Sequence, residues 1–146
     1  MRNVVQGLVL LAGAALLLAG FVVFQWVSFL RFGQTGLQIA LENQQSLPAQ
    51  VMLQPQQPVW TLWLAPLCAL AALFVGWRLM RVAAGQRTLL TMLLFGLGLV
   101  TFYPFWMTYT GWSVDFARTT DILATGFWLA LLGNLVVTVT ALVSSR

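Results

Sequence analysis

Histidine and lysine are absent from the chain, and only 7% of its 146 residues are charged. Without histidine, the sequence excludes histidine-ligated haem or chlorophyll, histidine metal sites and catalysis by a histidine general base. A soluble domain carries about 25% charged residues, so this chain has too few charges to cover a water-facing surface. Because 60% of its residues are hydrophobic, the composition predicts that lipid is its main solvent.

Reactive groups are also scarce. Cys68 is the only cysteine, so no disulfide can form within the chain. The sequence has no glycine-rich phosphate loop, nucleophile elbow or zinc motif. Asp115 and Asp121 are the only aspartates, with Arg118 between them; we interpret them as a loop ion pair with Asp121 capping the next helix. These features predict a non-enzymatic protein with no catalytic residue, no metal and no resident cofactor.

The chain does contain four long apolar runs. About 20 apolar residues are enough for a helix to cross a bilayer. We therefore predict a single membrane domain, residues 1–146, whose fold class is an all-α membrane protein, a four-transmembrane-helix bundle. Pro66 is expected to kink the second span. The predicted spans are residues 4–24, 59–80, 88–107 and 122–143, with outer loops 25–58 and 108–121 and an inner loop 81–87.

Arginine sets the predicted orientation. Arg78, Arg81 and Arg87 surround the link between the second and third runs, which contains no acid. With Arg2 and Arg146, five arginines fall on the side of this link, against two on the other side together with all three acids. Cytoplasmic loops carry the excess of basic residues, so both termini are predicted to lie in the cytoplasm. Most tryptophans gather at the opposite, outer ends of the runs: Trp26, Trp60, Trp63, Trp106, Trp112 and Trp128.

Two stretches of the first outer loop have the character of strands. Residues 25–32 are aromatic and β-branched, and residues 36–42 alternate so that their leucine and isoleucine side chains share one face. The intervening residues 33–36 are typical of a turn. We predict a small extracytoplasmic β-hairpin from these two stretches, with an irregular interfacial loop as the alternative.

Small and polar residues of the fourth span indicate where helices meet. Gly126 and Gly133 are seven residues apart, so they lie on nearly the same helix face, which we predict to be interior. Asn134 borders that face and needs a hydrogen-bond partner in lipid; we predict a bond between helices, with a ligand contact, for example to a quinone carbonyl, as the alternative. No charged residue is predicted at mid-membrane depth, which disfavours an ion or proton pathway.

Four positions, taken in order, form a recognisable layout: Trp26 after the first span, Thr35-Gly36 in the first outer loop, the basic link 78–87, and residues 126–133 opening the last span. This layout resembles small bacterial four-span membrane proteins with a claudin-like arrangement. The resemblance implies a left-handed four-helix bundle with a small extracellular sheet. The chain lacks the Gly-Leu-Trp and cysteine pair of claudins proper, so no tight-junction role is implied.

From these features we expect an accessory or structural subunit of a larger bacterial membrane complex. Its expected partners are membrane lipids and other membrane protein subunits. The alternative is a binding module for a hydrophobic cofactor or lipid, such as a quinone, a carotenoid or a pigment; a channel, a transporter and an enzyme rank below both. Nucleic acid is not expected as a partner, because the sequence has no basic stripe or nucleic-acid motif.

Overall fold

Four long helices dominate the computed structural model, which describes residues 2–29, 32–42, 59–81, 87–111 and 123–145. Their bounds are Arg2–Val22 for α1, Leu64–Arg81 for α4, Arg87–Gly111 for α5 and Thr125–Ser145 for α7. Each helix, α4 together with the short helix before it, is long and apolar enough to cross a membrane. This is the architecture expected of a multi-pass membrane protein.

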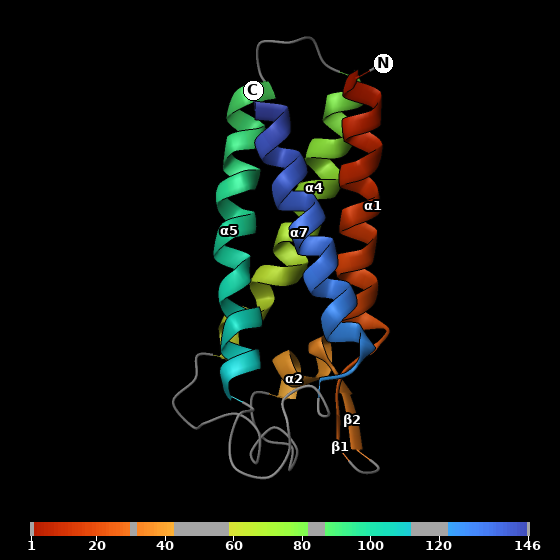
Figure 1. Cartoon of the computed structure of the whole chain (residues 1–146), viewed down its shortest axis with the longest axis vertical. Helices are drawn as coiled ribbons and strands as arrows, with labels where there is room; N and C mark the ends of the chain where they lie inside the picture. Colours follow the sequence, from red (N-terminus) through yellow and green to blue (C-terminus); the bar gives the residue numbers. More distant parts are fainter. Residues whose placement is uncertain (1, 30–31, 43–58, 82–86, 112–122, 146) are drawn as a thin grey trace.

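The four helices pack side by side in one bundle, and each runs antiparallel to its neighbours (Figure 1). Helix α1 packs against α4 and α7, and α5 closes the ring by packing against the same two helices. Both chain ends lie at one end of the bundle, whereas the β-hairpin and the short helix α2 lie at the other (Figure 1). The predicted bundle of four apolar helices, with a small hairpin after the first, is therefore confirmed.

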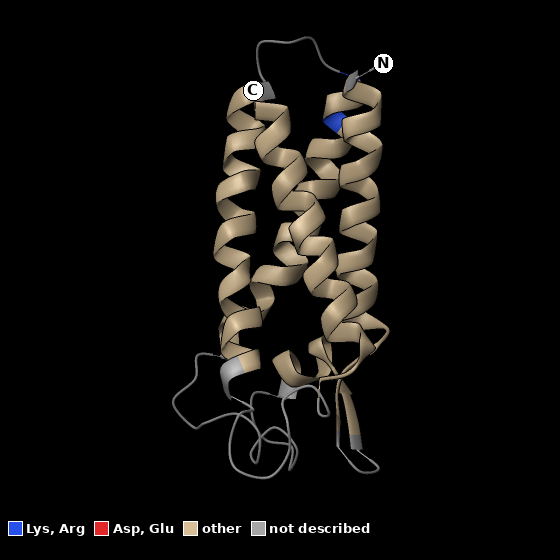
Figure 2. Cartoon of the chain, in the orientation of Figure 1, with Lys and Arg blue, Asp and Glu red and all other residues tan. Residues whose placement is uncertain are grey.

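Charge is confined to the ends of the described helices. Figure 2 shows no charged residue along nearly the whole length of the described bundle; a basic residue, in blue, lies near the end that holds the termini. The central stretches of the helices contain no charged residue: 3–22, 60–77, 88–109 and 125–145. A lipid environment makes burial of an unpaired charge costly, so this distribution fits helices that cross a membrane.

The hairpin consists of β1 (Gln25–Phe29) and β2 (Phe32–Thr35), which pair antiparallel. The pairing is irregular between Gln25 and Val27. Val27 also forms a bridge with Leu123, and the backbone N–H of Ala124 donates to the Trp26 carbonyl at 2.8 Å. The hairpin thereby ties the end of α1 to the start of α7.

The second predicted strand is wrong, because residues 36–42 form helix α2 (Gly36–Glu42). Thr35 and Gln38 explain the difference. The Thr35 Oγ1 accepts a hydrogen bond from the Gln38 backbone N–H at 3.1 Å, and the Gln38 Oε1 accepts one from the Thr35 backbone N–H at 2.9 Å. This reciprocal pair is a capping box, which satisfies N–H groups that have no partner within the first turn. Of the residues predicted as the turn, 33–35 belong to β2 and Gly36 is the first residue of α2.

Burial along α2 follows a helical period. Gly36, Ile39 and Ala40 are buried, at the spacing of one helix face. Leu41, which a strand would place on the same face as Ile39, is 63% exposed, whereas Ile39 is 3% exposed. The alternation of aliphatic residues therefore came from an amphipathic helix too short to show its period clearly.

The second span differs from the prediction near its start. A 3₁₀-helix, η1 (Val59–Trp63), comes first, and α4 follows it. Pro66 lies in the first turn of α4, where a missing N–H is tolerated. A change of helix type, from 3₁₀ to α, therefore comes just before Pro66. In α5, the helix continues through Pro104 to Gly111, past the predicted end at residue 107.

Candidate functional site

The backbones of α1 and α7 lie so close together at several glycines that a side chain there would not fit. A β-carbon at Gly20 would lie 2.6 Å from the Gly126 carbonyl oxygen, and one at Gly133 would lie 2.7 Å from the Gly13 carbonyl oxygen. Real β-carbons essentially never come within 3.0 Å of such an atom. Glycine on both helices therefore lets the two backbones pack directly on each other. The two glycines predicted as packing residues, Gly126 and Gly133, lie at this contact.

Asn134 joins three helices inside the bundle. Its side chain is fully buried, and its Nδ2 donates to the Gly98 carbonyl of α5 at 3.1 Å. The thiol of Cys68 on α4 donates to its Oδ1 at 3.6 Å. The hydroxyl of Thr138, one turn further along α7, donates to the Asn134 carbonyl at 2.8 Å. Both the nitrogen and the oxygen of the side-chain amide thus have a partner on another helix, which gives Asn134 a role in holding helices together.

A buried aromatic cluster closes the hairpin end of the bundle. Trp26 is 0% exposed. Its ring centroid lies 5.4 Å from that of Phe21, 5.3 Å from that of Phe105 and 5.6 Å from that of Phe127. The Trp26 indole N–H has no hydrogen-bond partner within the described part of the chain. The cluster therefore joins α1, β1, α5 and α7 by ring packing rather than by hydrogen bonding.

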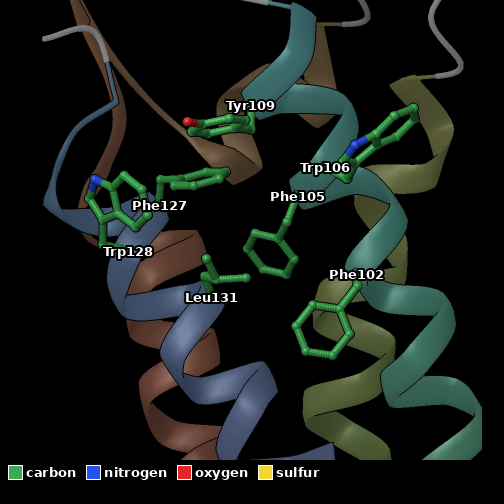
Figure 3. A pocket seen from close by; sticks show the side chains of 7 residues that line it. All are labelled: Phe102, Phe105, Trp106, Tyr109, Phe127, Trp128 and Leu131. Atoms are coloured by element: carbon green, nitrogen blue, oxygen red, sulfur yellow. The ribbon is translucent and has the colours of Figure 1, made fainter. Parts of the chain in front are cut away.

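A groove of about 420 Å³ opens between α5 and α7, next to this cluster. Figure 3 shows rings from both helices lying around the same space. Phe105 and Phe127 contribute to the groove on one side and contact Trp26 on the other. None of the lining side chains is charged, so the groove suits a neutral hydrophobic group. The lining residues are Phe102, Phe105, Trp106, Tyr109, Phe127, Trp128 and Leu131.

The outer face of α5 is open. Gly96 lies in the middle of this helix, and a β-carbon there would meet nothing within 4 Å. Its neighbours on the same face have exposed side chains, and α5 is the least buried of the four helices. The exposed apolar residues around Gly96 are Leu89, Met92, Leu93, Leu99, Val100, Tyr103 and Trp106. Together with Gly96 they form a surface that we name the α5 face.

The arginines predicted to set topology lie at the end of the bundle that holds the termini. Arg78 and Arg81 lie in the last turn of α4, and Arg87 is the first residue of α5. The predicted loop ion pair, formed by the aspartates Asp115 and Asp121 with Arg118, and the predicted helix cap at Asp121 lie outside the described residues. Within the described ranges, no group of three histidine, cysteine, aspartate or glutamate residues is placed to hold a metal ion.

The sequence predicts an aromatic outer rim and a hydrophobic groove formed by outer aromatic residues and the Pro66 kink, but it does not identify the residues that line the groove; Pro66 is not one of them. The signal was present, since Phe102, Phe105, Trp106 and Tyr109 recur at helical spacing on one side of α5. The sequence does not show which side of α5 faces α7. For the same reason, the sequence does not show that Gly96 faces outward whereas Gly98 contacts α7.

Comparison with known proteins identifies no relative: no protein-family model matches the chain, and no curated protein or solved structure is detectably similar to it. The contacts, burial and charges of the described residues are therefore the basis on which a function is proposed.

Proposed function

We propose that this chain is a non-enzymatic accessory subunit of a larger membrane complex in the bacterial inner membrane, and that the α5 face binds a transmembrane helix of the partner. Gly96 is the observation that carries the proposal. Small residues in membrane helices mark places where another helix approaches closely. The proposal therefore depends on how Gly96 compares with the other glycines of the bundle.

The other helix glycines of the described spans all meet another segment of the chain. A β-carbon at any of them would lie within 3.0 Å of an atom from elsewhere in the fold: Gly7, Gly13, Gly20, Gly76, Gly98, Gly126 and Gly133. Gly96 departs from this rule, and its neighbours Met92 and Leu99 are exposed on either side of it. A helix laid along α5 would find a notch at Gly96 flanked by long apolar side chains, which is the shape that close helix packing needs.

The proposed orientation places both termini in the cytoplasm and the hairpin outside. Arg78 and Arg81 support it, because they lie at the same end as the termini and basic residues are enriched on the cytoplasmic side. We also propose that the chain has the claudin-like layout, with a small sheet on the outer side. A hairpin at the opposite end, bridged at Val27 to Leu123 before the last helix, supports a small outer sheet.

Site-directed cross-linking in bacterial membranes tests the proposal. A photo-reactive residue replaces Leu93 on the α5 face, which is 63% exposed, or Val139 on α7, which is 51% exposed. The full-length chain is expected to give one discrete adduct from position 93 and none from position 139. Equal labelling by lipid alone at both positions would contradict a partner on the α5 face.

A second function is favoured by the groove between α5 and α7. Its volume of about 420 Å³ and its six aromatic side chains suit a neutral hydrophobic ligand such as a quinone, a carotenoid or a pigment. Leu131→Trp would fill the groove, whereas Leu135→Trp would add the same bulk on an exposed part of α7 away from it. Mass spectrometry of organic extracts is expected to show a stoichiometric ligand lost only in Leu131→Trp; only bulk phospholipid in all three proteins would rule this function out.

A further inference from the structure

Two arginines at the end of α4 each lie over an aromatic ring. The Arg78 guanidinium carbon lies 5.8 Å from the centroid of the Phe74 ring, and that of Arg81 lies 4.6 Å from the Trp77 ring. Each ring precedes its arginine by four residues, so both side chains bend back along the helix toward its N-terminus. The guanidinium groups therefore lie against the outer surface of the span, beside its apolar part.

Below the arginines, one face of α4 is apolar and exposed. Leu67, Leu70, Phe74 and Trp77 are all exposed, and their spacing of three to four residues places them in one stripe along the helix. The stripe belongs to a segment long and apolar enough to span a membrane. A bilayer would cover this stripe with acyl chains and would place its head groups near the arginines, since arginine and tryptophan mark the interface.

The two cations have no carboxylate partner in the described part of the chain. Arg78 and Arg81 make the ring contacts given above, and neither forms an ion pair with another described residue. They are also the only charged residues of α4. This end of the helix thus presents two positive charges that remain available to an anion from outside the chain.

A guanidinium held over a ring by a cation–π contact keeps N–H groups that can donate to another partner. Those N–H groups match phosphate oxygens in a two-point geometry that lysine does not reproduce. Arg78 and Arg81 are three residues apart, so they are neighbours on the helix surface. Contact with Phe74 and Trp77 restricts both side chains before binding, which lowers the entropy lost when a phosphate is bound.

We propose that Arg78 and Arg81 form a binding site for the phosphate group of an anionic phospholipid, whose acyl chain lies along the stripe of Leu67, Leu70 and Phe74. The apolar stripe selects a lipid over free phosphate, because it extends directly below the two cations. Two positive charges with no carboxylate partner among the described residues select an anionic head group over a zwitterionic one. The site lies on α4 and is independent of a partner on the α5 face.

Native mass spectrometry and thermal melts of the full-length protein in mild detergent test this site. Delipidated protein receives phosphatidylglycerol, phosphatidylcholine or inorganic phosphate at equal concentration. The wild type is expected to retain one phosphatidylglycerol and to melt at a higher temperature with it, and to show neither effect with the other two. An equal response to phosphatidylcholine would overturn the charge selection, and an equal response to inorganic phosphate would overturn the lipid assignment.

The variant Arg78→Gln/Arg81→Gln is expected to lose the retained phosphatidylglycerol. The matched control Arg31→Gln/Arg118→Gln removes the same net charge from positions outside α4 and is expected to retain it. Loss of the lipid in both variants would overturn the site, since net charge alone would then explain binding. A melt without lipid checks that the variants remain folded.

Trp77→Leu keeps both charges and the apolar stripe but removes one of the two rings. It is expected to bind phosphatidylglycerol about two- to fivefold more weakly than the wild type, which is the range for a cation–π contact at an exposed site. This variant does not depend on removing a charge, so it tests the ring contact separately. Unchanged affinity in Trp77→Leu would overturn the role of the rings.

Discussion

Gly133 on α7 and Gly96 on α5 are the same residue type within apolar helices, yet their surroundings are opposite. A β-carbon at Gly133 would lie 2.7 Å from the Gly13 carbonyl oxygen, whereas one at Gly96 would meet nothing within 4 Å. Burying apolar surface gives little advantage in lipid, because acyl chains are equally apolar. Close backbone packing therefore distinguishes the contact that the chain makes within itself from the face that it leaves open.

Aromatic residues show the same contrast. Trp26 is completely buried among rings from α1, α5 and α7, whereas Trp106 on α5 is 63% exposed. The buried ring fixes how the helices meet, whereas the exposed ring lies at the surface of the bundle and lines the groove between α5 and α7. Composition alone does not separate these roles; the side of the helix on which each residue lies does.

Replacing Trp26 should have the largest effect on the packing between the helices. Trp26→Ala is expected to lower the free energy of unfolding by about 3–5 kcal/mol, the range for removing a large buried aromatic side chain. Trp26→Phe should cost less, because the indole N–H has no hydrogen bond with a described residue to lose. Unfolding in mixed micelles with increasing denaturing detergent measures both. Trp60→Ala, at a ring 69% exposed, serves as control and should stay within about 0.5 kcal/mol of wild type.

Gly133→Leu tests the contact between α1 and α7. The new side chain would meet the backbone of Leu17 and Gly13, and a backbone cannot rotate away as a side chain can. The helices would have to separate, at an expected cost of about 1–3 kcal/mol, the usual range for overpacking. The same detergent unfolding assay measures it. Wild-type stability in this variant would mean that the two helices are not held together at Gly133.

The four helices and the presence of a hairpin after the first were predictable from the sequence, whereas the second strand of the hairpin and the faces of the helices were not. A run of about 20 apolar residues has few interpretations other than a span. A nearly uniform apolar helix, however, carries no signal for which side faces inward. Gly96 and Gly98 are two residues apart and about 200° apart around the helix, and only the packing of α7 shows that Gly98 is the one in contact.

Helix α2 shows a different limit. Residues 36–42 alternate like a strand, but the residues that are buried, Gly36, Ile39 and Ala40, lie on one side of a helix. The Thr35 and Gln38 pair carried the helix signal, since a threonine followed three residues later by glutamine is typical of a capping box. Local hydrogen bonding at the first turn outweighed the strand propensity of the alternating residues.

Asn134→Leu should weaken the packing between the helices only slightly. It removes the hydrogen bonds to Gly98 and Cys68, and such bonds in membrane proteins average about 0.6 kcal/mol. Leucine is also well accommodated in an apolar interior, so the free energy of unfolding is expected to fall by about that amount. A loss above about 2 kcal/mol, measured in the same assay, would indicate that Asn134 organises the bundle rather than adding to it.

Gly96→Leu should change stability least, although it adds the same side chain as Gly133→Leu. No atom lies within 4 Å of the added β-carbon, and leucine forms helices more readily than glycine, so the free energy of unfolding should stay equal to or slightly above that of wild type. If a partner helix binds the α5 face, the same variant should abolish the adduct formed from position 93 while the purified chain remains fully folded. Loss of stability in Gly96→Leu would show that this face is closed within the chain, and an unchanged adduct would show that the partner does not approach at Gly96.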